Sequence, residues 1–182
     1  NANLSGGDKN LNYYFNTGYL KQNDIQPGNP YQERISSRLN LHSLGMKDKL
    51  ESDFSIQYSI DKLKPSRVAT NYVGGVRFLP PNFPLYGEDG EYYWGSSAAF
   101  NISNPEASLN IKQENMTHNF LGSANFSYLI YKGLKAKAAF SYDNQSTNAE
   151  SKFPASAVNP YNPVEPGTSS TFGNYTSLNF EP

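Results

Sequence analysis

The stretch of sequence that decides the fold runs from residue 119 to residue 142 and reads NFLGSANFSYLIYKGLKAKAAFSY. Apolar and aromatic side chains occupy every second position in residues 119–131 and again in residues 134–142, with Ser, Asn or Lys between most of them. Successive side chains of a β-strand point to opposite faces of its sheet. The pattern therefore predicts two antiparallel strands, each with an apolar and a polar face, joined by a tight turn at Lys132-Gly133.

The same alternation recurs along most of the chain, whereas helical periodicity is nearly absent. We therefore expect an all-β protein, folded as an antiparallel up-and-down meander of about six to seven long strands. The strands are expected near residues 1–6, 10–24, 31–44, 50–62, 117–131, 134–145 and 171–181.

The connections between these segments alternate between short and long. Tight turns are expected at residues 6–9, 45–49 and 132–133, and longer connections rich in Pro, Gly and Asn at residues 25–30, 62–117 and 144–170. Alternate connections of a meander lie at the same end of the sheet, so the tight turns share one rim and the long loops share the other. This asymmetry, together with the apolar and polar alternation, is typical of an outer-membrane β-barrel whose long loops are extracellular.

A soluble β-sandwich is the alternative, since its strands also alternate where one face meets a core. Strands longer than the usual ~5 to 6 residues argue against it. So does a connection at 62–117 that is longer than ordinary compact domains use. The smallest bacterial barrels need eight strands, so the seven segments predict an arc of a larger barrel.

Composition excludes several other classes. The 182 residues correspond to one domain, and a net charge of -1 gives no electrostatic reason to expect nucleic acid. There is no cysteine, and no apolar run approaches the ~18 residues of a membrane-spanning helix. The chain opens at Asn1 without an initiator Met or a leader, from which we expect a processed protein or an excised piece.

The order and spacing of several short segments resemble the early barrel of SusC-like TonB-dependent transporters of Gram-negative outer membranes. The similarity extends over most of the chain. The segments are Ser5-Gly6-Gly7, Asn12-Tyr13-Tyr14-Phe15, Gly18-Tyr19-Leu20, Arg34 and Arg38 with Asn40, Pro80–Tyr86 running into Asp89-Gly90, and Phe120-Leu121-Gly122 through Lys135.

The resemblance implies part of a twenty-two-stranded barrel with an N-terminal plug, which imports oligosaccharides or peptides across the outer membrane. Its implied partners are a SusD-like surface lipoprotein, the TonB complex that supplies energy, and outer-membrane lipid. The chain contains no plug, no TonB-contacting segment and no closing strands of that family. It is therefore expected to be a barrel fragment that does not transport alone.

No catalytic constellation is present, and we expect neither an enzyme nor a cofactor nor a metal. His42 and His118 are the only histidines and form no HExxH-type pair. His42 lies at a position of its predicted strand that faces the polar side. We interpret it as a residue of the barrel wall that faces a water-filled lumen. Glu88 and Asp89 lack the spaced oxygen ligands of an EF-hand and are interpreted as a solvated turn.

Two groups of side chains are candidates for ligand contact. Aromatic rings in the long loop can stack on sugars or grip peptide side chains, or they can pack the loop upon itself. Positive side chains on the polar parity can steer anionic solutes through the lumen, or pair with a plug. The loop candidates are Phe83, Tyr86, Tyr92, Tyr93 and Trp94, and the lumen-facing candidates are Arg34, Arg38, Lys135 and Lys137.

A soluble carbohydrate-binding module with a β-sandwich fold is the alternative function. In the barrel interpretation, an isolated arc leaves unpaired N–H and C=O groups on both edge strands and removes the lipid from its aromatic face. We therefore expect the isolated chain to self-associate.

Overall fold

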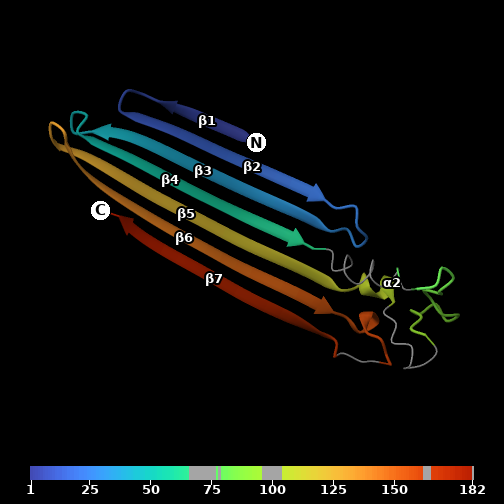
Figure 1. The fold of residues 1–182 in the computed structure, drawn as a ribbon. Coiled ribbons are helices and arrows are strands. Elements are labelled where there is room, and N and C mark those ends of the chain that lie inside the picture. Colours follow the sequence, from blue (N-terminus) through green and yellow to red (C-terminus); the bar gives the residue numbers. More distant parts are fainter. Residues whose placement is uncertain (66–76, 78, 96–103, 162–164, 182) are drawn as a thin grey trace.

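The computed structural model describes residues 1–65, 77, 79–95, 104–161 and 165–181. All seven strands form one antiparallel sheet in chain order, as Figure 1 shows. No helix of the described part is long and apolar enough to cross a membrane. The strands are β1 (Ala2–Gly7), β2 (Leu11–Asn23), β3 (Tyr31–Gly45), β4 (Leu50–Lys64), β5 (Lys112–Tyr131), β6 (Leu134–Phe153) and β7 (Gly167–Glu181), and the connections hold a short helix α2 (Pro105–Ser108) and a 3-10 turn η1 (Ala155–Ala157).

The register of the strands confirms the predicted faces. Tyr13 pairs with Leu41, Leu41 with Phe54, Phe54 with Ala124, and Ala124 with Phe140. Directly opposite residues of antiparallel strands project to the same side, so these side chains share one face of the sheet, here called the aromatic face. The opposite face is called the polar face, and it carries Arg34, Arg38, Lys135 and Lys137, each at a position of the other parity.

Phenylalanine rings from four strands follow one another across the aromatic face near the tight turns. The ring centroids of Phe54 and Phe126 lie 5.5 Å apart, those of Phe126 and Phe140 6.3 Å, and those of Phe140 and Phe180 4.8 Å. The rings therefore contact one another from strand to strand across the aromatic face of β4–β7.

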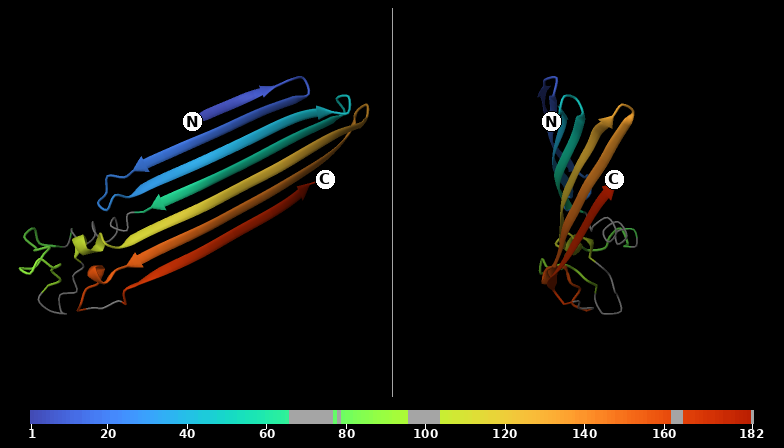
Figure 2. Two further views of the ribbon diagram at one scale, coloured as in Figure 1. Left: turned by 180° about the vertical axis from the view of Figure 1, so that it is seen from behind. Right: turned by 90° about the vertical axis from the view of Figure 1, so that its left-hand side faces the viewer.

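The sheet is a single layer, which rules out the β-sandwich alternative. A sandwich needs a second sheet packed on the apolar face of the first. All seven strands instead belong to one sheet, and Figure 2 shows that no further strand of the described residues lies against either side of it. Among the described residues, the buried apolar ones are Pro30, Pro105 and Ala107, and all three lie in connections rather than in strands. The sheet has no core of its own.

Three tight turns lie at one rim, as predicted, and the longer connections lie at the other (Figure 1). In the first turn the Asp8 carboxylate accepts hydrogen bonds from the backbone N–H groups of Asn10 and Leu11, which lower its pKa. The β3–β4 turn places Met46–Asp48 in the left-handed region. Gly133 has φ +87° beside a register shift between Leu129 and Tyr131, the arrangement of a hairpin with a glycine bulge.

The strands extend farther toward the loop rim than the sequence predicted. β5 begins at Lys112 rather than residue 117, β6 continues to Phe153 rather than residue 145, and β7 begins at Gly167 rather than residue 171. In these added parts polar side chains occupy both parities, so the alternation that marks a half-buried strand disappears while the hydrogen-bonded ladder continues.

Three tyrosines on the aromatic face form an inclined line, here called the tyrosine line. The row of cross-strand partners that starts at Tyr19 passes through Ile60 on β4 and Ser146 on β6. Tyr58 lies two residues closer to the tight turns than Ile60, and Tyr142 lies four residues closer than Ser146. The line therefore descends by one residue per strand.

This descent corresponds to a definite strand tilt. With a rise of ~3.3 Å per residue and a strand spacing of ~4.8 Å, one residue per strand gives a tilt of about 35°. Strands of membrane barrels tilt by about 35–45° from the barrel axis. The tyrosine line is thus level when the strands are placed at a barrel tilt, as expected of side chains at one membrane interface.

Candidate functional site

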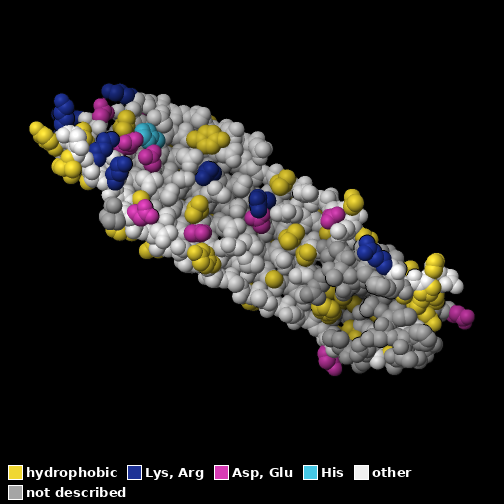
Figure 3. All heavy atoms as spheres, in the orientation of Figure 1, with side chains coloured by type: hydrophobic (Ala, Val, Ile, Leu, Met, Phe, Trp, Pro, Cys, Tyr) yellow, Lys and Arg dark blue, Asp and Glu magenta, His cyan; other side chains and the backbone are white. Residues whose placement is uncertain are grey.

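The polar face is turned toward the viewer in Figure 3, where acidic and basic side chains are scattered over the strands and a histidine lies near the tight turns. Arg34, on β3, forms an ion pair with the carboxylate of Asp61, its direct partner on β4. The same carboxylate lies 3.5 Å from the side-chain amide of Asn119 and the hydroxyl of Ser59. The Arg34 charge is therefore balanced within the sheet, which weakens its predicted role in steering anions.

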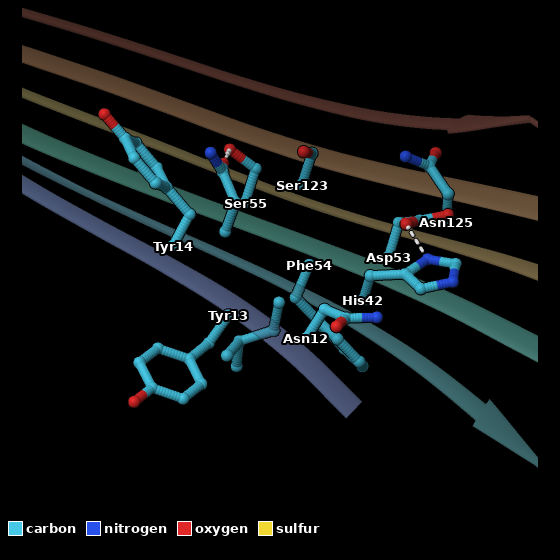
Figure 4. Close-up of a pocket in the computed structure, with 11 residues that line it drawn as sticks. Asn12, Tyr13, Tyr14, His42, Asp53, Phe54, Ser55, Ser123 and Asn125 are labelled. Carbon is cyan, nitrogen blue, oxygen red and sulfur yellow. Dashed lines mark hydrogen bonds and ion pairs between the residues drawn. The ribbon is translucent and has the colours of Figure 1, made fainter. Parts of the chain in front are cut away.

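His42 and Asp53 form a second cross-strand pair closer to the tight turns. Figure 4 shows the two side chains facing each other, with His42 Nδ1 2.7 Å from Asp53 Oδ1. Asn125 extends the same row onto β5, and Tyr13 and Tyr14 project to opposite sides of the sheet. The arrangement fits the interpretation of His42 as a wall residue.

Glu51 completes a group that has the composition of a metal site. His42, Glu51 and Asp53 each offer one ligand atom, and these atoms lie within 4.8 Å of one another. Asp53 is exposed and already accepts the contact from His42. Among the described residues, only this group has the composition of a metal site, and the hydrogen bond between His42 and Asp53 accounts for the arrangement without a metal.

The two candidate lysines lie beside this group, at the tight-turn end of β6. Lys135 and Lys137 line a shallow groove of about 440 Å³, with acidic residues of β4 and β7 on its other sides. The groove is lined by Glu51, Asp53, Asn125, Phe126, Ser127, Ala138, Ala139 and Glu181 besides the two lysines. Arg38 lies farther toward the loops, between Asn16 and Gln57. The four predicted cations therefore form no single patch, and acidic side chains accompany three of them.

The β4–β5 connection brings the predicted aromatic residues together. The rings of Tyr86 and Tyr92 stack with centroids 5.4 Å apart, and those of Phe83 and Tyr93 are tilted at 5.5 Å. Tyr86 and Tyr92 also pair through their backbones, at the base of a hairpin that turns at residues 87–90. Trp94 follows in the same segment and is half-buried.

These rings pack against one another within the loop, and one of them stays largely exposed to solvent. Phe83, Tyr92, Tyr93 and Trp94 are half-buried, whereas Tyr86 is 49% exposed. Partial burial and the nearby Glu106 carboxylate raise the pKa of the Tyr86 hydroxyl, which keeps it a neutral hydrogen-bond donor. Both interpretations of the loop therefore have support, and Tyr86 is the ring best placed to contact a ligand.

Asn104 holds this loop in place and was missed by the sequence analysis. Its side-chain amide donates hydrogen bonds to the carbonyls of Leu85 (2.7 Å) and Tyr93 (2.9 Å). Its side-chain oxygen accepts from the N–H groups of Glu106 and Ala107 at the start of α2. An Asn directly before Pro and Glu is a helix-start signal that could have identified this position.

No protein-family model matches the sequence, and no curated protein does either. The fold is similar to solved structures of the RagAB peptide importer. The similarity to the 'closed-closed' state has 22% identity and a TM-score of 0.68, and covers 96% of this chain and 20% of that chain. For the 'open-open' state the values are 20%, 0.68, 97% and 20%. A further structure of the RagAB peptide transporter gives 22%, 0.70, 98% and 20%.

These comparisons establish a shared fold. At about a fifth identity they do not show a shared substrate, and the chain spans only a fifth of the length of each matched structure.

Proposed function

We propose that this chain forms part of the barrel wall of a TonB-dependent, SusC-like importer in a Gram-negative outer membrane. The observation that carries the proposal is the single-layer sheet with an aromatic face, a polar face, tight turns at one rim and long loops at the other. Such a sheet is stable only where lipid covers the aromatic face and a wet lumen meets the polar face. The shared fold with a peptide importer supports the same conclusion.

The proposed substrates are peptides or oligosaccharides, and the peptide class is favoured by the fold shared with the RagAB peptide importer. The long loops are then extracellular, and a SusD-like surface lipoprotein covers that rim. In this arrangement the chain has no catalytic role and needs no cofactor. The β4–β5 loop contributes Tyr86 to substrate contact, on a support made by Phe83, Tyr92, Tyr93 and Trp94.

Uptake of labelled peptide and labelled oligosaccharide by cells that carry the full-length protein tests the proposal. We expect uptake of one class, its loss when the gene is deleted, and its loss when a protonophore removes the energy supply of TonB. Uptake that persists in the deletion strain would contradict the proposed function. Protein that does not fractionate with the outer membrane would contradict it independently.

The role of the loop is tested by substitution. Tyr86→Ala should reduce uptake several-fold without changing the amount of assembled barrel, because the ring is 49% exposed and its stacking partner Tyr92 lies in the same loop, outside the strands. Tyr131→Ala is the matched control, since Tyr131 is 75% exposed at the opposite rim. Simultaneous replacement of Tyr92, Tyr93 and Trp94 by Ala should also weaken uptake. Unchanged uptake in both loop variants would limit the aromatic cluster to packing.

A further inference from the structure

The part of the β4–β5 connection that carries Tyr86 lies at the loop rim beside α2 (Figure 1). All charged side chains of the described residues 79–95 and 104–111 are acidic. They are Glu88, Asp89, Glu91 and Glu106. The basic residues of this connection, Arg67 and Arg77, come before that segment in the sequence. The charge that the segment itself presents to a solute is therefore negative.

The Tyr86 ring is held in position by its neighbour in the hairpin. Tyr86 and Tyr92, here called the stacked tyrosines, are direct partners in an antiparallel bridge, so both side chains project to the same side. Their rings stack with centroids 5.4 Å apart, and Tyr86 remains 49% exposed. The backbone N–H of Gly87 donates to the carbonyl of Glu91 at 2.8 Å and closes the hairpin. A ring that is already positioned loses little conformational entropy when it binds a ligand.

Helix α2 brings one carboxylate to the stacked tyrosines. The Asn104 side chain donates to the carbonyl of Leu85 at 2.7 Å and accepts from the N–H of Glu106 at 2.9 Å. After the helix, the side-chain amide of Asn110 donates to the Tyr92 hydroxyl at 2.9 Å. Glu106 lies between these two attachments along the chain, so its position relative to the hairpin is fixed.

The charge of Glu106 acts on Tyr86 and has no basic partner in the described part of the chain. Desolvation and then the Glu106 carboxylate raise the pKa of the Tyr86 hydroxyl. Glu106 is half-buried, and no Lys, Arg or His of the described residues forms an ion pair with it. An exposed ring therefore stands beside a carboxylate whose charge is not balanced by these residues.

An ammonium or guanidinium group fits both features at once. A cation is attracted to the face of an aromatic ring when it lies within about 6 Å of the ring centroid. The same cation donates charge-assisted hydrogen bonds to a carboxylate. A neutral sugar can stack on the ring but leaves the carboxylate without a counter-ion, and an acidic peptide is repelled by the negative charge of the segment.

We propose that Tyr86 and Glu106 form a subsite for a basic side chain of an imported peptide, an arginine or a lysine. The subsite rests on the proposed function, since this loop meets peptides only if the chain is part of an importer. It favours peptides that carry positive charge over neutral oligosaccharides and over acidic peptides.

Two labelled peptides that differ at one side chain test the subsite in cells that carry the full-length protein. Both are acetylated at the N-terminus and amidated at the C-terminus, and one contains arginine where the other contains citrulline, which has a similar shape and no charge. Half-maximal uptake of the arginine peptide should require an about fivefold lower concentration. A third peptide, with a free N-terminus and no basic side chain, shows whether a terminal ammonium group can replace the side chain.

Two matched substitutions locate the effect. Glu106→Gln should reduce the advantage of the arginine peptide to less than about twofold and leave uptake of the citrulline peptide unchanged. A general disturbance of the loop would instead change the uptake of both peptides. Glu165→Gln removes the same charge from an exposed position in the β6–β7 connection and should leave the advantage in place.

Equal uptake of the arginine and citrulline peptides by the unmodified protein would overturn the subsite, as would an advantage that persists in Glu106→Gln. Uptake of the third peptide at the same concentration as the arginine peptide would assign the site to the N-terminus instead. Uptake of oligosaccharide alone would also overturn the subsite but would leave the importer standing. If no substrate enters in a gene-dependent way, the proposed function fails, and the subsite fails with it.

Discussion

The sheet and the β4–β5 loop differ in whether the protein itself buries their side chains. Large apolar residues of the sheet stay exposed, among them Tyr19, Ile56 and Phe140 at 58%, 45% and 46%. The loop is far shorter, yet it contains the buried residues Asn104 and Ala107, at 1% and 0% exposure. The loop carries its own small core, whereas the sheet depends on a surrounding medium. The loop is therefore stabilised by contacts within itself, whereas the stability of the sheet depends on what covers its aromatic face.

The largest effect that follows from this difference concerns the isolated chain. Without lipid, its aromatic face and the free edges of β1 and β7 remain uncovered, and hiding several hundred Å² of apolar surface is worth on the order of 10 kcal/mol. We expect residues 1–182 to aggregate or to associate through edges or aromatic faces. Light scattering should detect large particles that detergent micelles disperse. A monomer at micromolar concentration without detergent would contradict the comparison.

The next effect separates the two faces of the sheet. Ala124 on the aromatic face and Ser123 on the polar face are neighbours of similar size on β5. In the full-length protein in a bilayer, Ala124→Lys should lower the free energy of unfolding by about 2 to 3 kcal/mol, because it places a charge in lipid. Ser123→Lys should change it by less than ~0.5 kcal/mol. Urea titrations measure both, and equal losses would remove the lipid-facing assignment.

Within the loop, Asn104→Ala should destabilise the local fold by about 2 kcal/mol, since two carbonyls and two N–H groups lose their partner. Limited proteolysis of residues 79–95 should accelerate while urea unfolding of the barrel stays unchanged. Asn82→Ala, at an exposed position of the same loop, should not accelerate cleavage. Loss of barrel stability in Asn104→Ala would show that the loop and the sheet are coupled.

The smallest effect distinguishes two tyrosines within the loop. The Tyr92 hydroxyl accepts a hydrogen bond from the side-chain amide of Asn110 at 2.9 Å, whereas the Tyr86 ring is exposed. Tyr92→Phe should cost the loop about 1 kcal/mol and Tyr86→Phe close to nothing. Hydrogen exchange of the loop amides can resolve the difference. Equal effects would mean that ring stacking alone positions this hairpin.

The sequence was most informative where one face of the sheet is apolar and the other polar. Period-two alternation predicted the seven strands and both faces, because one residue of slip would turn a whole strand over. It failed beyond residue 145 and before Thr117, where the ladder continues through polar residues on both faces. The tight turns were predictable because Gly and Asp have specific turn roles.

The candidate sites were less predictable, since pairing across strands depends on register. Arg34 with Asp61 and His42 with Asp53 are separated by 27 and 11 residues, and no local pattern joins them. The loop aromatics were identifiable by composition, but their partners were not. Asn104 directly precedes Pro105 and Glu106, which is a helix-start pattern visible in the sequence. That pattern would have identified Asn104 as the residue that caps α2.

The Asn104-Pro105 step also bears on how this protein ages chemically. Asparagine deamidates when the backbone nitrogen of the next residue attacks the side-chain carbonyl to form a succinimide, and the nitrogen of proline has no N–H to lose. The amide that holds Leu85, Tyr93 and the start of α2 is therefore protected from that route by the residue that begins the helix. Deamidation of Asn104 would remove both donated hydrogen bonds and place a negative charge in a buried position. Pro105 thus extends the chemical lifetime of a loop whose shape depends on one neutral side chain.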